Sequence, residues 1–234
     1  MSPIQDESAQ DLENTLEVSA ADATLTAGER EAAQRIFGDR LPLAERYVEH
    51  LATSGIERGL LGPREVPRLW SRHVLNCAVI ESCIAENAVV ADVGSGAGLP
   101  GLCLAIARPD LHLTLIEPLE RRCIWLQEVI DDLELDNVVV WRGRAEAAVG
   151  LEEFTVVTAR AVSALDKLAR LTLPLLEGRG ELVAIKGRSA QDEIEKAQKV
   201  LKKLGAVKTD IVVCGEELLE ESTTVVRVRV GKQN

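Results

Sequence analysis

The stretch "VVADVGSGAGLPG", Val89–Gly101, decides the fold of this chain. An apolar run of strand length ends around an acid, Asp92, and three glycines then follow at every second position. Glycine adopts backbone conformations that other residues avoid, and it lets a ligand approach the main chain with no Cβ in the way. A strand followed by such a loop is typical of the first βα turn of a doubly wound sheet, where ligands bind beyond the strand ends.

Strand-length and helix-length segments alternate after this loop. The predicted strands are 89–93, 111–117, 138–142, 155–160 and 181–186, and the predicted helices are 99–107, 120–133, 164–176 and one that starts after Ser189 as its N-cap. Two further strands, 206–214 and 224–230, follow with no helix between them. We therefore predict an α/β fold with a Rossmann-like class I methyltransferase sheet, mostly parallel, that ends in a C-terminal antiparallel hairpin.

The first third of the chain has a different pattern. Helical spacing is predicted over 30–37, over 43–54 with Gly55 as a stop, and over 69–84, with a turn-rich link at 57–67. Residues 1–31 contain eight acidic residues and one basic residue, which accounts for −7 of the net charge of −11. We expect an acidic, disordered tail at 1–28, an N-terminal helical cap at 29–86, and an S-adenosylmethionine-binding domain at 87–234.

Composition narrows the cellular setting and the partners. No apolar run approaches the roughly 18 residues of a membrane span, and the N-terminal stretch lacks the basic and apolar regions of a signal peptide. The five cysteines form no C-x-x-C pair, so we expect reduced, buried thiols, a cytoplasmic protein, no metal and no membrane. Net acidity argues against tight general binding to nucleic acid, although it does not exclude a local basic face.

The glycine spacing distinguishes between ligands. The dinucleotide fingerprint G-x-G-x-x-G needs glycine or alanine where this chain has Leu99, and Asp92 would repel a pyrophosphate. The ammonium group of S-adenosylmethionine suits that carboxylate. Glu117 ends the next strand, where an acid accepts hydrogen bonds from both ribose hydroxyls. On these residues alone NAD remains the second candidate ligand, and a tight structural turn beside a solvated strand end remains the alternative to any ligand.

Several motifs together resemble the RsmG family, also called glucose-inhibited division protein B. They are "LWSRHVLNCAVI", "ADVGSGAGLPG", "IEPLERRCIWL", "RGRAEAA", "TARAVSALDKL" and "AIKG". The resemblance runs from about residue 43 to residue 187. It implies a bacterial methyltransferase that transfers a methyl group from S-adenosylmethionine to N7 of a guanine, 527 in conventional numbering, in 16S ribosomal RNA. The substrate it implies is that RNA within a small ribosomal subunit particle.

The resemblance also implies roles for particular residues. The implied cofactor-binding residues are Gly94, Gly96, Leu99, Glu117, Ala145, Glu146 and Arg160. The implied RNA-binding residues are Arg72, His73, Arg121, Arg122 and Lys186. Family members often have aspartate where this chain has Glu117, and a Lys-Arg pair where it has Arg121 and Arg122. On sequence alone His73 is more typical of a helix-surface or interface histidine, and the arginines are nearly as typical of a solvated face.

The residues present agree with methylation of a ring nitrogen. Guanine N7 carries an exposed lone pair and needs no deprotonation, so no acid or base residue is expected, and catalysis would rest on orientation. Arg160 and Lys186, each at a strand end, are expected near the reaction centre. The position after the fourth strand reads "ARAVSAL" rather than the Asn/Asp-Pro-Pro-Tyr/Phe motif of amine methylation, and no Pro-Cys marks a pyrimidine C5 nucleophile. A small-molecule or protein methyltransferase of the same fold remains the alternative function.

Overall fold

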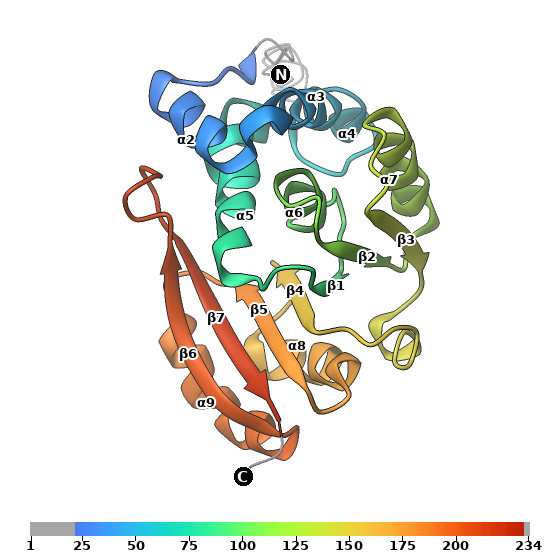
Figure 1. Cartoon of the computed structure of the whole chain (residues 1–234), viewed down its shortest axis with the longest axis vertical. Helices are drawn as coiled ribbons and strands as arrows, with labels where there is room; N and C mark the ends of the chain where they lie inside the picture. Colours follow the sequence, from blue (N-terminus) through green and yellow to red (C-terminus); the bar gives the residue numbers. More distant parts are fainter. Residues whose placement is uncertain (1–21, 232–234) are drawn as a thin grey trace, which may run out of the picture.

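A computed structural model of the chain describes residues 22–231, so residues 1–21 of the predicted tail lie outside the described residues. Its centre is one seven-stranded sheet in the order β3-β2-β1-β4-β5-β7-β6 (Figure 1). The strands are β1 Val89–Val93, β2 His112–Glu117, β3 Val138–Arg142, β4 Val156–Arg160, β5 Gly180–Ile185, β6 Ala206–Cys214 and β7 Thr223–Val230. The pairs among β1–β5 are parallel, and β7 runs antiparallel to both β5 and β6. The predicted mostly parallel sheet with a C-terminal antiparallel hairpin is confirmed.

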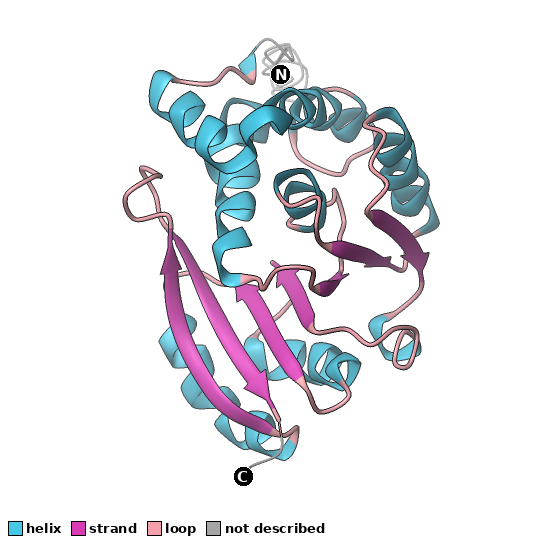
Figure 2. Ribbon diagram, in the orientation of Figure 1, coloured by secondary structure: helices cyan, strands magenta, loops and turns pink. Residues whose placement is uncertain are grey.

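Helices cover both faces of this sheet (Figure 2). The α-helices are α2 Ala27–Phe37, α3 Leu41–Ala52, α4 Ser54–Glu57, α5 Asn76–Ala78, α6 Gly101–Ala107, α7 Glu120–Asp132, α8 Leu165–Thr172 and α9 Ala190–Lys203. Alternate strand residues divide between two apolar clusters: Val90 packs with α2, α3, α6 and α7, whereas Ala91 packs with α8 and α9. This alternation follows from the two-residue period of a strand, and it produces three layers.

The N-terminal helices share the apolar cluster of one sheet face. Tyr47 of α3 and Leu69 are fully buried there beside strand residues such as Leu115. The division at residue 86 into a cap and a methyltransferase domain therefore stays a prediction. Helix α2 starts three residues before the predicted 30, because Thr26 and Glu29 form a reciprocal capping box.

Three local predictions need correction. Gly55 does not stop a helix: α3 ends at Ala52 and Gly55 lies inside α4. Residues 69–84 are helical but not one α-helix, since the π-helix η4, Leu69–Leu75, leads into α5 and then the 3-10 helix η5, Val79–Cys83. Ser189 stands at the N-cap position of α9 without capping it, because its hydroxyl donates to Glu193 instead.

The glycine loop is built around a buried carboxylate. Asp92 is fully buried, and it accepts hydrogen bonds from the backbone N–H of Gly101 at 3.2 Å and from the hydroxyl of Thr158 at 3.2 Å. Burial raises the pKa of Asp92 to about 6. Gly94, Gly96 and Gly98 all have positive φ, which explains the glycines at every second position. Within residues 22–231 no helix is long and apolar enough to cross a membrane.

Gly101 gives a test of this packing. An added Cβ would lie 2.3 Å from Leu115 Cδ2 and 2.7 Å from Asp92 Oδ2. We predict that Gly101→Ala lowers the free energy of unfolding by about 1–3 kcal/mol in urea titrations, because a well-packed core resists added volume. Gly28→Ala is the matched control, since nothing lies within 4 Å of its added Cβ. Equal urea midpoints for the two variants would contradict the packing described here.

Candidate functional site

The candidate site lies at the carboxyl ends of β1, β2 and β4. The glycine loop follows β1, Glu117 ends β2 and Arg160 ends β4. Parallel strands bring their carboxyl ends to one edge, so three segments separated by tens of residues meet there. The predicted cofactor residues of these three strands are thus placed at the same edge of the sheet.

Glu117 is the acceptor of this edge. Its side chain is 2% exposed, its Oε2 accepts the backbone N–H of Gly96 at 3.0 Å, and its Oε1 accepts the N–H of Leu119 at 2.9 Å. A carboxylate has about four lone-pair positions, so acceptor capacity remains for two hydroxyls of a ligand. This donor and acceptor set fits the ribose of a nucleoside, and it also ties the tip of the glycine loop to β2.

Arg122 lies beside Glu117, whereas its neighbour Arg121 does not belong to this set. Its Nη1 lies 3.7 Å from Glu117 Oε2 and 3.9 Å from the position of a Cβ on Gly96. Its Nε is buried and has no hydrogen-bond partner among the described residues. A buried donor without an acceptor costs free energy, so Arg122 fits a site where a ligand oxygen or ring nitrogen supplies the acceptor. Arg121 is exposed on the same helix.

The other predicted cofactor residues offer mainly backbone. Leu99 is buried and packs in the core, so only its main chain is available to a ligand. Ala145 begins the short 3-10 helix η6, Ala145–Ala147, and is buried, whereas Glu146 is exposed. At Gly94 an added Cβ would lie 3.1 Å from Val162 Cγ2. The cofactor roles of these residues stay predictions.

Arg160 belongs to a hydrogen-bonded chain of three side chains, in which His73 lies between Arg160 and Glu65. Its Nη2 lies 2.6 Å from Nδ1 of His73, and Nε2 of His73 lies 2.7 Å from Oε2 of Glu65. Its Nη1 also donates to Cys77 Sγ at 3.0 Å and, more weakly, to the carbonyl oxygens of Arg72 and His73. Because a guanidinium only donates, Nδ1 of His73 must be the acceptor and Nε2–H must donate to Glu65. Residues of the π-helix η4 therefore hold the guanidinium of Arg160 in place.

The protonation of this chain follows from its surroundings. Burial lowers the pKa of His73; the hydrogen bond to Glu65 opposes that shift and the Arg160 cation adds to it. The hydrogen bond from His73 lowers the pKa of Glu65. Sequence reasoning missed Glu65, because it lies in a link of glycines and prolines that indicates only a turn. The buried His73 thus orients Arg160, and its predicted contact with RNA stays untested.

Lys186 is engaged inside the protein. Its side chain is 9% exposed, and its Nζ donates to the carbonyl oxygen of Ser163 at 2.6 Å and to Oε2 of Glu193 at 2.8 Å. Glu193 also accepts the backbone N–H of Leu165 at 2.8 Å. Lys186 therefore joins the end of β5 to α9 and to the loop after β4. This geometry gives it a structural role that the strand-end pattern alone did not indicate.

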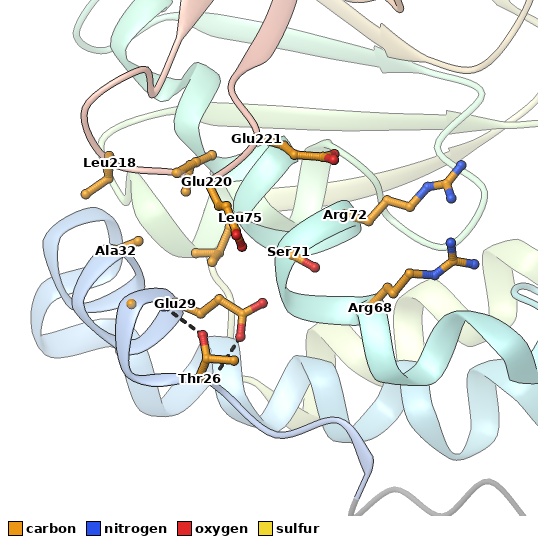
Figure 3. A pocket seen from close by; sticks show the side chains of 12 residues that line it. Thr26, Glu29, Ala32, Arg68, Ser71, Arg72, Leu75, Leu218, Glu220 and Glu221 are labelled. Carbon is orange, nitrogen blue, oxygen red and sulfur yellow. Dashed lines mark hydrogen bonds between the residues drawn. The ribbon is translucent and has the colours of Figure 1, made fainter.

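Two exposed arginines, Arg68 and Arg72, line a cavity of about 970 Å³ that is also lined by Glu29, Glu220 and Glu221 (Figure 3). Arg68 and Arg72 point the same way from one side of it, the start of α2 forms another wall, and the loop between β6 and β7 forms a third. Arg68 pairs with Glu65 at 2.7 Å, whereas the side chain of Arg72 has no hydrogen bond or ion pair within residues 22–231. No local pattern predicted this cavity, because its walls come from three distant segments.

The family model described as rRNA small subunit methyltransferase G matches residues 40–224. The chain belongs to this family. It is 76% identical to "Ribosomal RNA small subunit methyltransferase G" of Paenarthrobacter aurescens (strain TC1) over 89% of this chain and 96% of that protein. It is 53% identical to the protein of the same name from Streptomyces avermitilis over 86% of this chain and 85% of that protein.

Two solved structures share the fold of this chain at low sequence identity. A SAM-dependent O-methyltransferase from Thermotoga maritima matches with a TM-score of 0.53 and 12% identity over 80% of this chain and 72% of that one. M. jannaschii TYW2 in complex with AdoMet matches with a TM-score of 0.55 and 20% identity over 70% of this chain and 78% of that one. At these identities the likeness shows the fold, which is that of Rossmann-like S-adenosylmethionine-dependent methyltransferases.

The Glu65–His73–Arg160 chain predicts a specific titration. We expect NMR to show His73 as the neutral Nε2–H tautomer at pH 7, with a pKa below the ordinary 6.5. The unfolded chain then binds more protons as the pH falls, so the stability contributed by His73 is present above about pH 6.5 and is lost as the pH falls through the folded pKa. Glu65→Gln removes the partner that raises this pKa, so the midpoint should move lower still. A midpoint at or above 6.5 in the native protein would refute this arrangement.

Proposed function

We propose that this protein is an S-adenosylmethionine-dependent methyltransferase that methylates N7 of a guanine, 527 in conventional numbering, in 16S ribosomal RNA. Membership of the small subunit rRNA methyltransferase family supports the RNA substrate. The observation that carries the proposal is the joining of the glycine loop to Glu117 beside the unpaired Nε of Arg122. This set offers a charged acceptor and a donor to one nucleoside at the ligand edge of the sheet.

The cofactor is proposed to lie across the ends of β1 and β2. Glu117 would accept both ribose hydroxyls while it keeps its bonds to Gly96 and Leu119. Residues 145–146, after β3, would contact the adenine. The main chain at Gly94, Gly96 and Leu99 would line the methionine end, close to the buried carboxylate of Asp92. S-adenosylmethionine supplies a methyl group on a sulfonium, which a neutral nitrogen lone pair attacks without prior deprotonation.

The residues at the reaction edge suit an orienting role. Arg160 is permanently charged, and His73 is held neutral with both ring nitrogens engaged. Neither is arranged to take a proton from a substrate, and guanine N7 has none to give. Arg160 would hold the purine or the cofactor in the attack geometry, where orientation contributes several kcal/mol.

The RNA is proposed to approach over η4 and the start of α7. Arg72 and Arg121 are exposed and lack ion pairs within the described part of the chain, so both are available to phosphates. Arg68 shares its guanidinium with Glu65 and is a weaker candidate. A few cations on an acidic chain favour a structured RNA presented in a small ribosomal subunit particle over general binding.

Removal of the ribose acceptor tests the cofactor site. Each charge-assisted hydrogen bond contributes about 1.5–3 kcal/mol, so Glu117→Ala should weaken S-adenosylmethionine binding in calorimetry by at least about tenfold. Glu117→Gln, which keeps the shape, should give an intermediate loss. Glu120→Ala is the matched control because that side chain is 62% exposed. Wild-type affinity in a folded Glu117→Ala protein would remove Glu117 from the site.

The substrate is tested by mapping and by charge removal. We expect 16S rRNA from a strain lacking the protein to have lost N7-methylguanosine at one position, and the purified protein to restore it on small subunit particles. Arg72→Ala should reduce this methylation, leave cofactor affinity intact, and lower the slope of log binding constant against log salt by about 0.7–0.9 for a lost phosphate contact.

Arg179→Ala is the control for charge, because that exposed arginine lies at the opposite end of β5. Intact rRNA methylation in the deletion strain would favour a small-molecule or protein substrate. Equal salt slopes for the two arginine variants would place the RNA elsewhere.

A further inference from the structure

Two cysteines from distant segments meet at β6, the outermost strand of the sheet at the end far from β1 and β2. Cys83 is the last residue of η5 and Cys214 the last residue of β6, and their Sγ atoms lie 3.2 Å apart. Both are free thiols. We propose that Cys83 and Cys214 form an oxidation site, at which hydrogen peroxide converts the two thiols into a disulfide.

The two thiols differ in access. Cys83 is half-buried, so a small oxidant can reach it from solvent. Cys214 is 4% exposed and lies directly behind it. Cys83 is therefore the residue that meets the peroxide, and Cys214 is the resolving thiol already within contact of the sulfur it must attack.

The charges around the pair favour a thiolate at Cys83. The hydrogen bond from Cys214 lowers the pKa of Cys83 to about 7 against the effect of burial, and the guanidinium of Arg227 on β7 adds to the lowering. Glu181 on β5 opposes it, but that carboxylate is paired with Arg227 at 2.7 Å. The hydroxyl of Ser82 acts in the same direction as Arg227. The lowered pKa of Cys83 favours its thiolate at neutral pH, and the thiolate is the reactive form.

The chemistry needs peroxide and no other reactant. The Cys83 thiolate attacks one peroxide oxygen, the O–O bond breaks, and a sulfenic acid and hydroxide result. Cys214 then attacks the Cys83 sulfur, the S–O bond breaks, and the leaving hydroxide takes the Cys214 proton to form water. The two sulfurs lose two electrons in total and the peroxide oxygens gain them, which leaves one S–S bond.

The chain contains its own matched controls. Cys77 and Cys103 are both fully buried, and Cys77 accepts a hydrogen bond from Arg160. Cys123 is 8% exposed, and burial together with the nearby Glu117 carboxylate raises its pKa. Against the effect of burial, the hydrogen bond with Cys103 and the charge of Arg160 lower the pKa of Cys77, but that thiol is out of reach of solvent. Burial therefore disfavours oxidation at all three positions. Selectivity for Cys83 is therefore part of the proposal.

The Cys83–Cys214 disulfide would join the predicted helical cap to the β6–β7 loop, which forms one wall of the large cavity. The loop between β6 and β7 begins at Gly215, whose added Cβ would lie 2.8 Å from Val79 Cγ2. Residues 218–221 of this loop line the cavity beside Arg68 and Arg72 (Figure 3). A disulfide at Cys214 anchors the first residue before that loop, so amide exchange over residues 215–222 should slow on oxidation.

The full chain treated with hydrogen peroxide tests the site. We expect a product lighter by two hydrogens, a tryptic peptide pair linked through Cys83 and Cys214, slower amide exchange at 215–222, and full reversal by dithiothreitol. At pH 7 iodoacetamide should label Cys83 at least about tenfold faster than Cys123, because the pKa of Cys83 is lowered whereas that of Cys123 is raised, and because Cys83 is the more exposed thiol.

Two variants separate the roles of the thiols. Cys214→Ser should stop the reaction at a Cys83 sulfenic acid that dimedone traps, whereas Cys83→Ser should leave Cys214 unoxidised. No linked peptide from the wild-type protein, or a disulfide through Cys77, Cys103 or Cys123, would overturn the proposal. These measurements need no methyl transfer, so they stand apart from the proposed function.

Discussion

The buried carboxylate of Asp92 is the constraint on which the candidate site depends. It joins β1 to the start of α6 through Gly101 and to β4 through Thr158, with no exposure to water. Burying this charge has a cost that shows in its raised pKa of about 6. Because the folded pKa lies above the unfolded one, the ionised form of Asp92 lowers stability as the pH rises from about 3.8 through 6. The fold keeps this costly group where the glycine loop must turn.

His73 has the opposite linkage to pH. Its folded pKa is lowered, so protonation on acidification opposes folding, whereas protonation of Asp92 favours it. Both groups lie at the ligand edge: Asp92 lies just before the glycine loop, and His73 contacts Arg160. The site therefore combines an acid that is hard to ionise with a base that is hard to protonate. With a pKa of about 6 Asp92 is still mainly ionised at neutral pH, whereas His73 is neutral, so the charged groups of this edge are Asp92, Glu117, Arg122 and Arg160.

Short-range patterns predicted much of this arrangement from the sequence. The strands, the glycine turn and Glu117 depend on residue spacing and on the parallel topology, both of which are visible in the chain. The partners of strand-end cations were not visible. Lys186 and Arg160 are both basic residues at the end of a strand. Lys186 pairs with Glu193 on the next helix, whereas Arg160 is held by His73, which lies 87 residues earlier in the chain. Arg121 and Arg122 differ because consecutive helical residues point in directions about 100° apart.

The π-helix η4 explains how one segment serves two surfaces. Arg72 lines the large cavity (Figure 3), whereas the next residue, His73, is buried against Arg160. The carbonyl oxygens of both residues also accept from Arg160, so the guanidinium contacts the backbone that carries Arg72. π-helical turns are rare and frequent at functional sites. A substrate phosphate on Arg72 and a ligand at Arg160 would therefore both depend on one short, continuous piece of main chain. A shift of that main chain would move Arg72 and Arg160 together.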